Sequence, residues 1–266
     1  MNPRVAAVVE NEWAQLVRNK VVIFTTLVPP FLLVGMAIAV LLLTMWIDIG
    51  VDNMARSAAP LLGGSSDLSG LTGADTMRAA LLSPFLVLFQ MIPLVVPITI
   101  ASYSIIGEKQ SKSLEALLST PIRTWELLLG KALASALPGV LATWYSFIIF
   151  AVVAHFTVSE ALTSHLILGP TWMLTMLVLT PLFSLLAVGL AIIISSRVKD
   201  PQSAQQLGSL LVLPLVGALV AQVTGAVSVN VGFIVGSAMG VALLDAFLLF
   251  LGVRLFRRET ILTSWK

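Results

Sequence analysis

The sequence has no cysteine and very few charged residues. Both shortages exclude certain classes of function. Without cysteine, disulfides, thiolate catalysis and thiolate metal sites are excluded. Only 11% of the 266 residues are charged and 58% are hydrophobic, whereas soluble domains carry about 25% charged residues. The few basic residues are scattered over short loops, so they form no patch that would bind nucleic acid.

The hydrophobic residues are concentrated in long runs, which predict six membrane-spanning helices. Each run is long enough to cross about 30 Å of hydrocarbon at about 1.5 Å per residue. Only Ser228, Val229 and Asn230 separate the last two, so one of these could be partly re-entrant. We expect an all-α integral membrane protein with a single transmembrane domain over residues 1–266. The expected spans are 21–47, 79–106, 132–154, 166–195, 207–227 and 231–253.

The basic residues predict the orientation of these spans. Thirteen of the 15 Lys and Arg residues fall on the side of the two termini, and only Arg56 and Arg78 fall on the other side. Basic residues are enriched in short cytoplasmic loops. We therefore expect a multi-pass protein of the plasma (inner) membrane with both termini in the cytoplasm, and an external loop at 48–78.

An amphipathic helix is expected before the first span, within residues 1–20. Its apolar residues fall on one face, which suits a helix lying in the cytoplasmic interface with Trp13 at headgroup depth. The alternative is a helix that packs on the cytoplasmic ends of other spans, and the two arrangements are compatible. The apolar face consists of Val5, Val9, Trp13, Leu16 and Val17.

The segment 107–131, GEKQSKSLEALLSTPIRTWELLLGK, is a charged and patterned interruption between the second and third spans. Leu114, Leu117 and Leu118 share one helical face, and Pro121 ends that helix. A second short helix with Trp125, Leu128 and Leu129 is expected before the third span. This pattern favours a surface that docks a cytoplasmic partner; the alternative is an interfacial helix stabilised by lipid alone.

This segment resembles the cytoplasmic loop of type 2 ABC transporter permeases, the exporter-like half-transporters. Glu12, Arg18, Lys20 and Pro29 of ENEWAQLVRNKVVIFTTLVPP also fit the N-terminal elbow of that family. The chain lacks the large external domain of many members, which leaves the export route open. The positions of the loop that match are Glu108, Lys109, Leu114, Glu115, Leu117, Leu118, Thr120, Pro121, Leu129, Gly130 and Lys131.

The resemblance implies a mechanism and partners. The loop would carry a coupling helix that sits in a groove of a separate ABC ATP-binding subunit, and two permease chains would pair as a homodimer or heterodimer. The docking and transmission residues implied are Glu108, Leu114, Glu115, Leu118 and Pro121. The sequence contains no G-x-x-x-x-G-K-[ST] phosphate loop. We therefore expect a transport subunit that is not an enzyme and has no cofactor of its own, with ATP and Mg bound by the partner.

Two polar residues within the spans are candidates for the transport path. Asp245 is the one carboxylate deep in an apolar run, where a charge is costly unless it is paired, hydrated or protonated. Gln90 lies among Pro84, Pro93 and Pro97, which can kink the second span. The alternatives are a neutral Asp245 bonded to a neighbouring helix and prolines that pack statically.

Two other classes of function compete with an ABC permease. An ion-coupled secondary carrier would need several ionisable groups within the spans, and a membrane-embedded enzyme would need paired catalytic residues at one depth. The sequence offers only Asp245 for either role. His155 and His165 have no standard metal-ligand spacing, so no metal site is expected.

Overall fold

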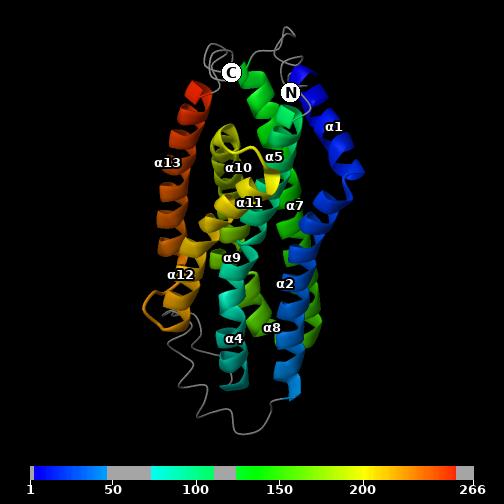
Figure 1. The fold of residues 1–266 in the computed structure, drawn as a ribbon. Coiled ribbons are helices and arrows are strands. Elements are labelled where there is room, and N and C mark those ends of the chain that lie inside the picture. Colours follow the sequence, from blue (N-terminus) through cyan, green and yellow to red (C-terminus); the bar gives the residue numbers. More distant parts are fainter. Residues whose placement is uncertain (1–2, 47–72, 111–123, 256–266) are drawn as a thin grey trace.

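A computed structural model describes residues 3–46, 73–110 and 124–255 as an upright helical bundle (Figure 1). In these three ranges all regular secondary structure is helical. Six of the helical segments are long and apolar enough to cross a membrane. The beginning of α1 and the end of α13 lie at the same end of the bundle, here called the N-terminal end (Figure 1). The chain is therefore an all-α, multi-pass integral membrane protein.

Within each described range the helices follow one another with few intervening residues. In chain order they are α1 (Pro3–Arg18), α2 (Lys20–Trp46), α4 (Gly73–Phe89), α5 (Ile92–Gln110), α7 (Thr124–Thr157), α8 (Glu160–Leu162), η3 (Thr163–Ile167), α9 (Pro170–Leu174), η4 (Thr175–Leu179), α10 (Thr180–Arg197), α11 (Pro201–Gly208), η5 (Ser209–Leu211), α12 (Val212–Val223) and α13 (Val231–Leu255).

The second predicted span is longer than 79–106, and it is broken in the middle. α4 and α5 together cover 73–110, so helix replaces the last residues of the expected external loop. The break falls at Gln90 and Met91, whose N–H groups bond to carbonyls only three residues back, at 3.1 and 3.0 Å. Pro93 explains this break, because it has no N–H and its ring crowds the carbonyl four residues earlier.

The prediction of a separate short helix before the third span was wrong. α7 begins at Thr124 and continues without interruption to Thr157. Gly130 is the weakest helix former near its start, and a single glycine costs only about 1 kcal/mol relative to alanine. That glycine also lets α1 approach, since a Cβ at Gly130 would lie 2.7 Å from Cγ1 of Val8.

Side-chain donors replace the backbone donors that proline removes from two spans. Pro138 cannot bond to the carbonyl of Ala134, and the indole N–H of Trp13 from α1 donates to that oxygen at 3.1 Å. Pro84 likewise provides no N–H for the carbonyl of Ala80. That carbonyl accepts a hydrogen bond from the Ser83 hydroxyl at 3.2 Å instead. Backbone groups in hydrocarbon must be satisfied internally. These contacts therefore allow helices with internal prolines to persist in the bundle.

The fourth span contains a π-helical turn with the same kind of compensation. In η4 the N–H of Thr180 bonds to the carbonyl of Thr175, five residues back. The next carbonyl, that of Met176, would then need the N–H that Pro181 lacks. The indole of Trp144 on α7 donates to it instead, at 2.7 Å.

The spans differ widely in how deeply they are buried. The second span has 72% of its most apolar window buried, whereas the fifth and the sixth have 17% each. An aromatic cluster lies against the second span, with the rings of Phe150 and Trp172 stacked at 5.8 Å between their centroids. α4 and α5 therefore form the centre of the bundle, and α12 and α13 lie at its edge (Figure 1).

Candidate coupling site

A buried ionic cluster joins three helices at the N-terminal end of the bundle. The ammonium group of Lys131 on α7 pairs with the carboxylates of Glu12 on α1 and Glu108 on α5. The distance from Lys131 Nζ to Glu108 Oε2 is 2.8 Å, and Nζ also donates to Ser104 Oγ at 2.9 Å. We call Glu12, Ser104, Glu108 and Lys131 the ionic cluster.

All three charged residues of the ionic cluster are almost completely buried. Glu12 is 3% exposed, Glu108 6% and Lys131 4%. Taking a charge out of water costs several kcal/mol, and only close pairing and hydrogen bonding offset this. Lys131 supplies the positive charge for both carboxylates, so the cluster depends on that residue more than on either glutamate.

The cluster lies next to both ends of the predicted coupling region. α5 ends at Gln110 and α7 begins at Thr124, so these two helices flank 111–123. Of the predicted coupling residues, Glu108 is described and its carboxylate faces into the protein. Leu114, Glu115, Leu118 and Pro121 lie outside the described residues, and their roles stay predictions.

The end of α5 is also bonded to the end of the fourth span and to the turn that follows it. Lys109 Nζ donates to the carbonyl of Ser196 at 3.4 Å, and Gln110 Nε2 donates to the carbonyl of Lys199 at 3.0 Å. Asp200 then caps α11 by accepting from the N–H of Ser203 at 2.8 Å. A displacement of the end of α5 would therefore reach the fourth and fifth spans as well as α1 and α7.

The first half of the N-terminal helix packs on the bundle, and its position in the cytoplasmic interface stays a prediction. Val5 and Val9 are buried, and α1 packs mainly on α7, so the packed alternative describes its first half. Toward the other end Trp13 is partly exposed and Val17 is 74% exposed. The apolar face is therefore divided between a protein neighbour and the surroundings of the bundle.

Gln90 lies at the break in the second span and contacts the π-helical turn of the fourth span. Its side chain is 1% exposed, and Nε2 donates to Thr180 Oγ1 at 3.0 Å. Thr180 is the residue that closes the π-helical turn of the fourth span. Gln90 also lines a partly open cavity of about 250 Å³ with residues of α10, α12 and α13. The breaks of the second and fourth spans are thus directly bonded to each other.

Asp245 lies in different surroundings. It is 6% exposed on α13, and neither carboxylate oxygen has a hydrogen-bond partner in the described ranges. One turn further along, Leu248 packs on α10, where a Cβ at Gly189 would be 3.2 Å away. The cavity that Gln90 lines includes Leu244 but not Asp245. The structure therefore does not bring the two transport-path candidates into one cavity.

Sequence reasoning missed the ionic cluster as a unit. Glu12 and Lys131 are 119 positions apart, and pairing between such distant residues has no periodic signal. The available signal was that Glu108 closely follows one long apolar run and Lys131 directly precedes another. Within the described residues, no group of three or more His, Cys, Asp or Glu side chains could hold a metal ion.

The apolar bundle and its six candidate membrane spans define a multi-pass membrane protein. A family model described as "ABC-2 family transporter protein" matches residues 6–251. The chain therefore belongs to the ABC-2 transporter family, and it is a membrane permease of an ABC transporter. A comparison with the curated proteins gave no match.

Proposed function

We propose that the chain exports its substrate as one of two permease subunits, driven by ATP that a separate ABC ATP-binding subunit hydrolyses with Mg. The observation that carries this proposal is the ionic cluster beside the 111–123 segment, in a chain of the ABC-2 family. A separate ATP-binding subunit can move the spans only through a docking surface and a rigid connection from that surface to the spans. The cluster supplies such a connection between α1, α5 and α7.

The predicted coupling residues divide into two roles under this proposal. Glu108 transmits motion, because its buried carboxylate is bound to Lys131 and cannot at the same time reach a partner protein. Leu114, Glu115, Leu118 and Pro121 form the docking surface for the ATP-binding subunit. Their leucines would contribute apolar contact area, and Glu115 would set the orientation of the contact.

The pairing of two permease chains is supported by the exposure of the last two spans. The most apolar windows of the fifth and sixth spans are only 17% buried. Exposed positions on α13 include Leu243, Phe247 and Phe250, all large and apolar. Lipid covers such a surface in part, and a second permease chain is the proposed neighbour for the rest. Asp245 and Gln90 remain proposed contributors to the transport path.

The proposed setting is the plasma (inner) membrane with both termini in the cytoplasm. The support for it is the distribution of basic residues, thirteen on the N-terminal side against two on the other. A cytoplasmic N-terminal end would place 111–123 where ATP is available.

Co-purification of an ATP-binding subunit tests this function. The chain is purified in mild detergent from its native cells, and any ABC ATP-binding subunit that stays bound is identified and quantified. We expect Glu115→Lys combined with Leu118→Asp to abolish binding. Glu108→Gln should keep the subunit bound but lower the ATPase rate of the complex. If the unchanged chain retains no ATP-binding subunit, the proposal is wrong.

A further inference from the structure

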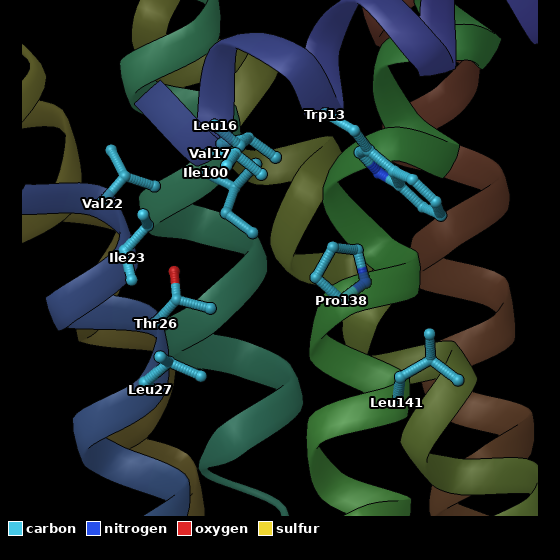
Figure 2. A pocket seen from close by; sticks show the side chains of 10 residues that line it. All are labelled: Trp13, Leu16, Val17, Val22, Ile23, Thr26, Leu27, Ile100, Pro138 and Leu141. Carbon is cyan, nitrogen blue, oxygen red and sulfur yellow. The ribbon is translucent and has the colours of Figure 1, made fainter. Parts of the chain in front are cut away.

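A cavity of about 350 Å³ lies beside the junction of α1 and α2, apart from the ionic cluster and from the Gln90 cavity. Figure 2 shows that side chains of α1, α2, α5 and α7 surround it, among them Trp13, Leu27, Ile100 and Leu141. Nearly all of its lining atoms are apolar. Its volume is within the range of about 300–1,000 Å³ that is typical of small-molecule sites.

The change of direction between α1 and α2 produces this cavity. Asn19 separates the two helices, and its side-chain oxygen accepts from the N–H of Val22 at 3.4 Å. α1 then slopes along the side of the bundle, and α2 continues from the bend toward the opposite end (Figure 1). The space under the bend is not filled by any side chain of the described residues.

The cavity opens toward the surroundings of the bundle. Val17 is 74% exposed, Leu27 48% and Leu141 52%, and all three line it. Because the candidate span in α2 begins at Val22, the part of the opening beside Leu27 would face hydrocarbon in a membrane. An apolar chain from the bilayer can therefore enter sideways without crossing water.

Two cations lie at the same junction. Arg18 ends α1 and Lys20 begins α2, both side chains are exposed, and neither has an ion-pair partner in the described ranges. At about 1.5 Å per residue, Lys20 precedes Leu27 by about 10 Å along α2. The junction thus places positive charge at one end and an apolar cavity further along the span, as a phospholipid requires.

A polar group inside the cavity adds to this pattern. The hydroxyl oxygen of Thr26 is buried and has no hydrogen-bond partner in the described part of the chain. Figure 2 shows the Thr26 hydroxyl among the apolar side chains that line the space. A lone hydroxyl there is costly unless it bonds to something. The ester oxygens that link an acyl chain to its headgroup would accept a hydrogen bond from Thr26.

We propose that the junction of α1 and α2 is a binding site for one anionic phospholipid. An acyl chain occupies the cavity, Thr26 bonds to the ester group, and Arg18 and Lys20 hold the phosphate headgroup. This site is independent of ATP-driven transport and would exist in the isolated permease chain. Its occupant would hold α1 at a fixed angle to the first span.

Lipid retention by the full chain tests this proposal. Native mass spectrometry in detergent counts the lipids bound after titration with phosphatidylglycerol or with phosphatidylcholine of the same acyl chains. Anionic lipids interact with a nearby Lys or Arg by about 1 kcal/mol per residue, equivalent to about fivefold in affinity. We expect one phosphatidylglycerol to be retained preferentially, and Arg18→Gln and Lys20→Gln each to weaken it about fivefold.

Matched variants separate the headgroup site from the acyl-chain site. Leu27→Trp should fill the cavity and remove the bound lipid, whereas Leu32→Trp adds the same bulk to an exposed position that does not line it. Arg197→Gln with Lys199→Gln removes two exposed cations elsewhere on the chain and should leave the preference unchanged. Equal retention of both lipids, or the same retention by Leu27→Trp and Leu32→Trp, would overturn the proposal.

Discussion

Glu108 and Asp245 are both buried acidic residues on apolar helices, but their surroundings differ. Glu108 is paired with Lys131, which also binds Glu12 and Ser104, so four residues from three helices meet around one ammonium group. Neither carboxylate oxygen of Asp245 has a partner in the described ranges. Removing one partner of a buried ion pair is strongly destabilising, because the other charge is left buried and unpaired, whereas a carboxylate without a partner lowers stability until something binds it. Under the proposed function, the ionic cluster transmits force, and Asp245 remains a proposed contact for cargo.

Of the changes that test this difference, removing Lys131 should lower stability the most. Lys131→Met leaves two buried carboxylates facing each other without a cation, and breaking a buried pair costs about 3–5 kcal/mol. Thermal unfolding in detergent measures the loss. Lys199→Met, at an exposed lysine, is the control and should change stability by less than about 0.5 kcal/mol. Equal shifts for the two variants would show that the cluster contributes nothing to stability.

The contact between Trp13 and α7 should have a smaller effect. Trp13→Phe leaves the carbonyl of Ala134 without its donor, and an unsatisfied buried acceptor costs about 1–3 kcal/mol. Pro138→Ala restores the backbone N–H that can reach this carbonyl. In a double-mutant cycle we therefore expect Trp13→Phe to cost less in the Pro138→Ala background. An unchanged cost would mean that the indole contributes through packing alone.

The close approach of α1 to α7 can be tested at Gly130. Gly130→Ala would place a Cβ 2.7 Å from Cγ1 of Val8 and should cost about 1–3 kcal/mol by overpacking. Val8→Ala should relieve most of this cost in the double variant, as urea unfolding would show. Gly236→Ala is the control, because nothing lies within 4 Å of a Cβ there. If Gly130→Ala lowers stability as little as Gly236→Ala does, α1 can move away from α7 at no cost.

The smallest effect on stability is expected at Asp245. Asp245→Asn removes no hydrogen bond or ion pair within the described ranges, so the unfolding temperature should stay the same or rise slightly. Glu108→Gln is the matched change at the paired site, and it should lower the unfolding temperature. A marked loss of stability in Asp245→Asn would show that its carboxylate does have a structural partner.

The sequence allowed the fold class to be predicted, because membrane spans are strong local signals. The run 21–47, for example, differs from α2 (Lys20–Trp46) by one residue at each end. The break at Gln90 was harder to place, since it depends on which of three prolines disrupts the helix. The pairing of Glu12 with Lys131 could not be predicted, because it arises from helix packing between distant segments. Gln90 was identified as a candidate, but its bond to Thr180 required the structure.

The central claim is that the ionic cluster connects the ATP-binding subunit to the spans, and an exchange of charges tests it most directly. Glu108→Lys and Lys131→Glu each upset the balance of charges, whereas the double variant keeps two acidic residues and one basic residue in the same space. We would measure the ATPase rate of the purified complex for the unchanged chain and these three variants. The account predicts that both single variants lose most of the rate and that the double variant regains a large part of it. Single variants that hydrolyse ATP as fast as the unchanged complex would contradict the account.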